Sequence, residues 1–161
     1  MSIWFQQPTL EVCQYLNQGI KRSGTLMQTL GIEIHEIGDS YLSAKMEAKP
    51  RIHNPLGMVH GGANVALAET VASYAANFAV DFDKYYCVGQ EISASHLKAV
   101  KKGILIATTT PLHIGKRSSV WHVEVCNNKH EVTCIARMTA AVVERHPKKS
   151  PMIEVETAKV Y

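Results

Sequence analysis

The sequence predicts an α+β domain in which one antiparallel β-sheet wraps around a single long helix. Strand-like segments come in the order two strands, one long apolar helix, then four strands. The helix is apolar nearly all round, which is typical of a helix buried in protein, and a single sheet must cover its apolar face with something. A chain of 161 residues, 46% of them hydrophobic, also suits one compact domain with its own core.

Two short helices are predicted before the first strand. Thr9 can cap an amphipathic helix that stops near Gly19 and whose apolar residues are Leu10, Val12, Cys13 and Leu16. A second helix is expected over residues 25–30. We therefore divide the chain into short packing helices at 1–30, the main domain at 31–145, and a C-terminal tail at 146–161.

Alternation of apolar and polar residues predicts the strands. The first two, at 32–35 and 41–48, form a hairpin with one wet face, because Gly38-Asp39 supplies a turn. Pro50 and Pro55 make residues 49–55 a loop, and the long helix follows it. Four more strands are expected at 86–98, 103–113, 118–126 and 131–144. An open sheet leaves exposed edges, and pairing the edge strands of two subunits would remove one edge per chain.

Composition argues against several classes of function. The net charge of +3, from 17 basic and 14 acidic residues, does not indicate a nucleic-acid partner, although it suits a small anionic ligand. The His and Cys spacings match no zinc site, so we expect no metal, and reduced thiols at Cys13, Cys87, Cys126 and Cys134. The N-terminal residues show no secretory signal, which predicts a cytoplasmic location. The apolar stretch Met58–Val80 is long enough to cross a membrane, but Glu69 near its centre argues against lipid.

The candidate site lies where the long helix begins, at His60-Gly61-Gly62. Backbone N–H groups at a helix start are free and carry the positive end of the helix dipole, and glycines let a ligand approach them. A thioester carbonyl develops negative charge on its oxygen during attack and would be stabilised there. Alternatively, the two glycines only allow the helix to pack closely on the sheet.

Glu69 is a carboxylate in the middle of this apolar helix, which is costly unless the group is paired or functional. It is either a general base or nucleophile, with Ser73 one turn further along the same face as its helper, or one half of a structural ion pair. His60 is either structural or part of the site. Asn54 either positions water or the thioester sulfur, or holds its loop by turn-type hydrogen bonds.

The spacing of His60 and Glu69 predicts a shared site. Nine residues separate them, which corresponds to roughly 13 Å along a helix. One reacting carbon cannot touch both within a chain, because attacking groups must lie about 3 to 3.5 Å from it. If both serve one site, a second copy must lay its helix antiparallel beside the first, and two equivalent sites per dimer follow.

The pattern N-x-x-G-x-x-H-G-G followed by L-A-E-T-x-x-S resembles the hotdog-fold acyl-CoA thioesterases of the PaaI type, especially the bacterial aryl-CoA and 1,4-dihydroxy-2-naphthoyl-CoA hydrolase branch. The likeness runs from about Leu30 to Val143 and includes the stretches 88–96, 111–117 and Val120-Trp121. It implies a hotdog fold that dimerises into a continuous sheet, assembly into a dimer of dimers, and hydrolysis of an aryl-CoA or small acyl-CoA. No cofactor is implied beyond the coenzyme A that forms part of the substrate.

The resemblance also implies roles for individual residues. Glu69 would be the catalytic carboxylate, the Gly61 N–H would polarise the thioester carbonyl, His60 would line the same spot, and Ser73 would assist near the water. Coenzyme A would contact Gly89 and two further segments, which comprise His96, Leu97, Lys98 and Ala99, and His113, Ile114, Gly115, Lys116, Arg117 and Ser118. The branch usually carries glutamine where this chain has Asn54.

Two other functions are compatible with the same motifs. One is a hotdog dehydratase or hydratase, which also sets a carboxylate against a histidine. The other is a non-catalytic module that binds acyl-CoA and in which Glu69 is a buried structural ion. Within the thioesterase hypothesis, general-base attack by water and an acyl-glutamyl anhydride both remain open.

Overall fold

The protein is described by a computed structural model that covers residues 2–5 and 8–145, so the predicted tail at 146–161 lies outside the described residues. Its helices are α1 (Leu10–Ile20), α2 (Leu26–Leu30), the 3-10 turn η1 (Pro50–Ile52) and α3 (Gly61–Phe78). Its strands are β1 (Glu33–Ile37), β2 (Leu42–Glu47), β3 (Tyr85–His96), β4 (Ile104–Ile114), β5 (Ser118–Cys126) and β6 (Val132–Glu144). The predicted order of two strands, one long helix and four strands is confirmed.

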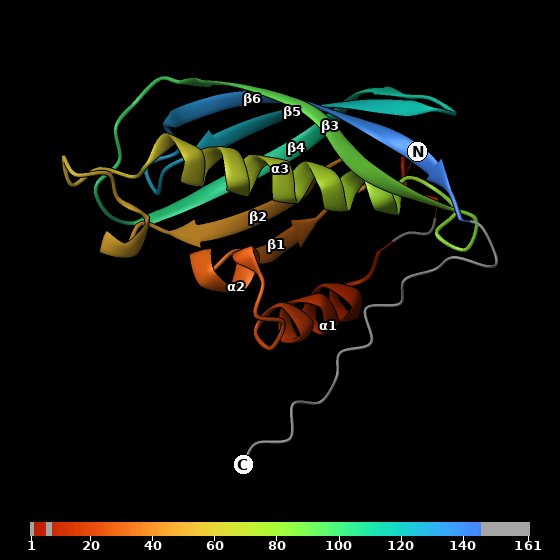
Figure 1. The fold of residues 1–161 in the computed structure, drawn as a ribbon, viewed down its shortest axis with the longest axis horizontal. Coiled ribbons are helices and arrows are strands. Elements are labelled where there is room, and N and C mark those ends of the chain that lie inside the picture. The colour runs from red at the N-terminus through yellow and green to blue at the C-terminus, as the bar shows by residue number, and fades with distance from the viewer. Residues whose placement is uncertain (1, 6–7, 146–161) are drawn as a thin grey trace, which may run out of the picture.

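The six strands form one antiparallel sheet in the order β1-β2-β4-β5-β6-β3, and its concave face wraps around α3 (Figure 1). The core lies between the sheet and one face of this helix, where Leu67 and Val71 are fully buried with Trp121 and Met138. β3 pairs only with β6 among the described strands, so its other side is an open edge. α3 therefore lies against the concave face of the sheet and contacts β3, the long edge strand.

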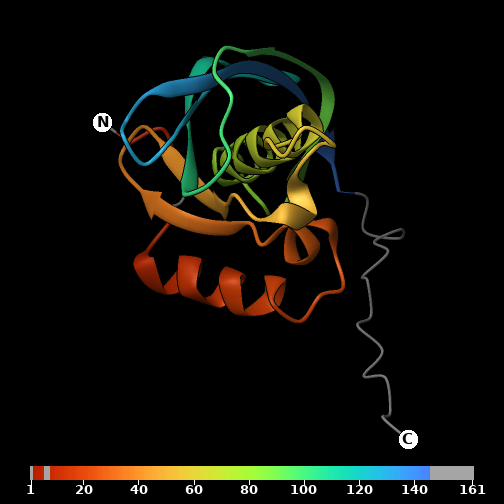
Figure 2. The same ribbon diagram turned by 90° about the vertical axis from the view of Figure 1, so that its left-hand side faces the viewer.

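The outer face of the first hairpin differs from the prediction. Figure 2 shows α1 packed beneath β1 and β2, on the side of the sheet away from α3. The amide of Asn17 accepts from the Ile34 N–H and donates to the Ile34 carbonyl, both at 2.8 Å. Both backbone groups of Ile34 at the free edge of β1 are thus hydrogen-bonded. Ser43 is buried rather than exposed to water, and its hydroxyl donates to the Glu36 carbonyl at 3.4 Å, so the expected wet face was wrong at this position. On α1 itself, Cys13 is buried whereas Leu10 and Val12 are exposed.

The four cysteines are free thiols. Burial raises the pKa of Cys13, Cys134 and Cys87, and the pKa of Cys87 reaches about 11. These thiols are therefore protonated near neutral pH and are poor nucleophiles. Among the described residues, no helix is both long and apolar enough to cross a membrane.

Candidate active site

The loop that leads into α3 is held by Asn54. Its Oδ1 accepts from the N–H groups of Leu56 (3.0 Å) and Met58 (3.3 Å), and its own N–H donates to the Met58 carbonyl at 2.7 Å. The turn also uses the positive φ of Gly57, 73°, which glycine adopts without strain. Among the described residues no acceptor is bonded to Nδ2 of Asn54. The turn-type hydrogen bonds are thus present, and the amide N–H₂ group remains available.

His60 caps the start of α3. Its Nδ1 accepts from the Gly62 N–H at 2.9 Å, so the neutral ring carries its proton on Nε2. Capping removes one of the free N–H groups of the helix start. The neighbouring Gly61 N–H has no acceptor among the described residues. It therefore remains free to donate to a ligand.

Gly61 lies directly against β3. A Cβ placed on Gly61 would come within 2.7 Å of Nε2 of His96, the last residue of that strand. His96, Leu97, Lys98 and Ala99 are all exposed at this end of the sheet. The predicted segment 96–99 thus lies beside the helix start, as a shared site would require.

Glu69 contacts the first half of β3, at Gly89. A Cβ placed on Gly89 would lie 2.7 Å from Oε1 of Glu69, so the carboxylate occupies the space that the glycine leaves. The side chain is partly exposed, and none of the ion pairs between described residues includes it. The structural ion pair considered above therefore has no partner within the described chain.

Gly61 and Glu69 do not meet within one chain. They contact β3 at His96 and Gly89, seven residues apart, and they lie eight residues apart on α3, roughly 12 Å along the helix. Glu69 and Gly61 therefore require a second chain if they serve one reaction.

The second predicted coenzyme A segment begins at the same level of the sheet as Gly89, which Glu69 contacts. Ile114 pairs with Ser119, Ser119 with Ala140, and Ala140 with Gly89, which forms one row across the sheet. Within this turn His113 packs over Gly115, whose N–H donates to the Ser118 carbonyl at 3.0 Å. Segment 113–118 thus lies at the level of Glu69, whereas 96–99 lies at the level of Gly61.

The cations of these two segments differ. Lys98 forms an ion pair with Glu131, a contact that lowers the pKa of the Glu131 carboxyl. Lys116 and Arg117 are exposed and form no ion pair with any described residue. These two are the freer candidates for a phosphate group.

Asn77 is a contributor that motif reasoning missed. Its Oδ1 accepts from the Cys87 N–H at 2.9 Å, while Nδ2 donates to the carbonyls of Cys87 (3.1 Å) and Ser73 (2.9 Å). This amide locks the start of β3 to the last turns of α3, two residues before Gly89. The side chain of Ser73, by contrast, forms no hydrogen bond with another described residue. A polar residue inside an apolar helix was the only sequence signal for Asn77.

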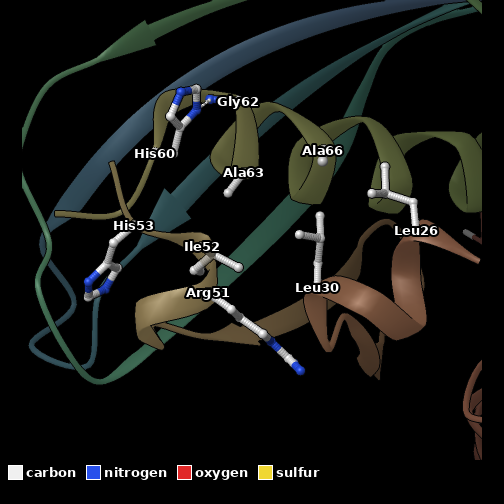
Figure 3. A pocket seen from close by; sticks show the side chains of 9 residues that line it. All are labelled: Leu26, Leu30, Arg51, Ile52, His53, His60, Gly62, Ala63 and Ala66. Carbon is white, nitrogen blue, oxygen red and sulfur yellow. Dashed lines mark hydrogen bonds between the residues drawn. The ribbon is translucent and has the colours of Figure 1, made fainter. Parts of the chain in front are cut away.

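A pocket of about 370 Å³ opens beside His60 and Gly62, between α2, η1 and the first half of α3 (Figure 3). Leu30 points toward Ala66 across it, and Arg51 extends along its rim. Among the described residues, no three His, Cys, Asp or Glu side chains cluster so that they could hold a metal ion.

The sequence is similar to a family model and to several named proteins. A family model described as the thioesterase superfamily matches residues 56–134. A Vibrio cholerae protein named for an expected esterase activity is 42% identical over 96% of this chain and 100% of its own. The 1,4-dihydroxy-2-naphthoyl-CoA hydrolase of Escherichia coli is 33% identical over 88% of this chain and 99% of its own.

Solved structures of proteins called thioesterases are also similar to this chain. A mutant thioesterase from Pseudomonas aeruginosa superimposes with a TM-score of 0.82 at 36% identity, covering 89% of this chain and 100% of that one. A Staphylococcus aureus protein, called a thioesterase in one of its structures, superimposes with TM-scores of 0.72 and 0.70 at 30% and 31% identity. Those two structures cover 75% and 73% of this chain and 100% and 97% of their own. They carry a glutamate and a glutamine, respectively, replaced by alanine.

Proposed function

Since the chain belongs to the thioesterase superfamily and has its hotdog fold, it is a thioester hydrolase, and we propose that it cleaves acyl-CoA with Glu69 in a site shared by two protomers. The observation that carries the proposal is the Glu69 carboxylate, which lies against Gly89 with no cation paired to it among the described residues. The spacing of the two mutated positions in the staphylococcal protein supports it. They lie 15 residues apart, as Asn54 and Glu69 do here.

The proposed dimer joins the open edges of two β3 strands. If they pair antiparallel about a two-fold axis between Ile92 and Ser93, Gly89 of one protomer lies opposite His96 of the other. Glu69 of one protomer then approaches Gly61 of its neighbour, because each contacts one of these two positions on β3. Segments 96–99 and 113–118 of different protomers then come to the same level of the joined sheet, where coenzyme A would bind.

In the proposed reaction Glu69 accepts a proton from water as the oxygen attacks the thioester carbonyl carbon. The negative charge that develops on the carbonyl oxygen is stabilised by the Gly61 N–H and by the positive end of the α3 dipole. Collapse of the intermediate breaks the carbon–sulfur bond and releases the coenzyme A thiolate. The alternative anhydride route forms a bond between Glu69 and the acyl carbon first. A single turnover in labelled water separates them, because only the anhydride route places solvent oxygen in the Glu69 carboxylate.

We extend the proposal to an aryl or small acyl group, since a relative is named for a naphthoyl-CoA substrate. The proposed location is the cytoplasm, where the four free thiols would stay reduced. Release of free thiol from benzoyl-CoA, short-chain and long-chain acyl-CoA tests the activity directly. Loss of enoyl absorbance without thiol release would instead identify a dehydratase or hydratase, and binding without turnover would identify a non-catalytic module.

Mixing two inactive variants tests the shared site. Glu69→Gln removes the carboxylate, and Gly61→Val places side-chain atoms where the His96 ring lies. After unfolding and refolding together, hybrid dimers contain one intact site, so the mixture should recover about one quarter of wild-type activity if protomers combine at random. Each variant refolded alone is the control. Failure to recover activity, with hybrids demonstrated by a tag on one variant, would contradict a shared site.

Asn54 should contribute through its free amide N–H₂ group. Asn54→Asp keeps the Oδ1 that accepts from Leu56 and Met58 and loses the donor, so the loop should persist while kcat falls about tenfold. Asn54→Ala removes both and should also lower the melting temperature by a few degrees. Steady-state kinetics and thermal melting measure the two effects. If Asn54→Asp retained full kcat, the role of Asn54 would be limited to the loop.

A further inference from the structure

The pocket beside His60 is walled mostly by apolar side chains, and His53 also lines it. Leu26 and Leu30 come from α2, Ile52 from η1, and Ala63 and Ala66 from α3 (Figure 3). The two alanines leave the space open, because their side chains end at Cβ. At about 370 Å³ the pocket lies within the size range of small-ligand sites. One end lies at His60 and Gly62, next to the Gly61 N–H where the thioester carbonyl would be held.

The far rim of the pocket carries Arg51, the one residue among those that line it with a permanent charge. Its Nη2 lies 2.6 Å from the position that a Cβ on Gly31 would occupy. Gly31 ends α2 with φ at 71°, and its missing side chain lets the guanidinium lie along the end of that helix. Arg51 is exposed and forms no ion pair with any described residue. The pocket therefore combines an apolar stem with an unneutralised cation at one end.

We propose that this pocket receives the acyl group and that Arg51 selects acyl groups with a carboxylate at the end remote from the thioester. This inference rests on the proposed function. Methylene or ring atoms would lie against the leucines and alanines, and the carboxylate would accept two hydrogen bonds from the planar guanidinium. The Arg51 guanidinium lies at Gly31, at the end of α2, whereas Gly61 begins α3, so the substrate has one orientation that satisfies both the Gly61 N–H and Arg51.

A matched pair of substrates tests the inference. Adipyl-CoA and hexanoyl-CoA have acyl chains of the same length and differ in the carboxylate that replaces the terminal methyl group. The wild-type protein should prefer adipyl-CoA by about tenfold or more in kcat/KM. Arg51→Gln should lower the adipyl-to-hexanoyl ratio by at least tenfold. Arg51→Glu should shift the preference toward 6-aminohexanoyl-CoA.

Two further measurements keep the outcomes distinct. Ala66→Leu fills the pocket and should lower kcat/KM for both six-carbon substrates relative to acetyl-CoA, which tests the location even if the Arg51 variants fail to fold. Calorimetric binding of adipyl-CoA and hexanoyl-CoA gives the same ratio without turnover. A wild-type protein that binds or hydrolyses hexanoyl-CoA as well as adipyl-CoA would overturn the inference alone. Absence of hydrolysis of any CoA thioester would overturn the proposed function, and the binding ratio would still decide the role of Arg51.

Discussion

Glu69→Gln should lower kcat by about a thousandfold while the protein keeps its fold, because a general base or nucleophile contributes on this scale. Glutamine has nearly the same shape as glutamate, and Glu69 forms no ion pair with another described residue that the substitution would break. The amide can neither accept the proton of water nor attack the carbonyl carbon. Thiol release from the best substrate measures the loss, and circular dichroism with thermal melting checks the fold.

Glu124→Gln is the matched control. Glu124 lies on β5 at an exposed position beside His122, away from α3, so the same chemical change should alter kcat by less than about twofold. An unaltered rate in Glu69→Gln would remove the carboxylate from the chemistry and leave the dimer model without its central residue. A melting temperature far below that of the wild type would instead indicate that Glu69 is structural.

Much of the fold follows from local patterns. Trp121, Val123 and Val125 alternate with polar residues and are fully buried, and the predicted strand at 118–126 coincides with β5. The other three strands after α3 begin and end within one or two residues of the prediction. For β4, β5 and β6 these boundaries could be predicted because burial on one face of a sheet imposes a period of two on the sequence. α3 could also be predicted from a local pattern, because its apolar stretch is too long for a strand.

Features that depend on contacts between residues far apart in the chain could not be predicted from the sequence. Ser43 alternates with apolar neighbours as an exposed residue would, but it is buried, and its hydroxyl donates to the carbonyl of Glu36 on the neighbouring strand. Asn77 likewise gains its role from Cys87 on the neighbouring strand, which no spacing along the chain reveals.

The candidate site likewise has parts that one segment of the sequence reveals and parts that depend on distant contacts. The glycines and Glu69 stand out locally, because a helix start and a charged residue in an apolar helix are visible in one segment. The pocket beside His60 depends on residues near 26–31 meeting residues near 51–66, and it was not predicted. The contact of Glu69 with Gly89 was also unpredicted, since it joins two elements at a single point.

That contact leads to the second large effect that we expect. Gly89→Ala adds a methyl group 2.7 Å from Oε1 of Glu69, too close for the carboxylate to stay in place. The carboxylate is the end of a flexible side chain, so the fold should persist, but a displacement of about 1 Å from the reacting position can cost about a hundredfold in rate. We expect kcat to fall by roughly this factor, with a much smaller change in KM. Gly19→Ala is the matched control, because nothing lies within 4 Å of the added methyl group.

A double variant shows whether Gly89→Ala acts through Glu69. If it does, adding Gly89→Ala to Glu69→Gln should cause little further loss, because the group that it displaces no longer reacts. Independent effects would instead multiply, giving a loss near the product of the two single factors. That result would mean that the methyl group disturbs the β3 edge or the proposed dimer rather than the carboxylate, and sedimentation of Gly89→Ala would then show a shift toward monomer relative to the wild type. If the Glu69 carboxylate occupies the space that Gly89 leaves open, Gly89→Ala should keep the proposed dimer, and its loss of rate should not multiply with that of Glu69→Gln.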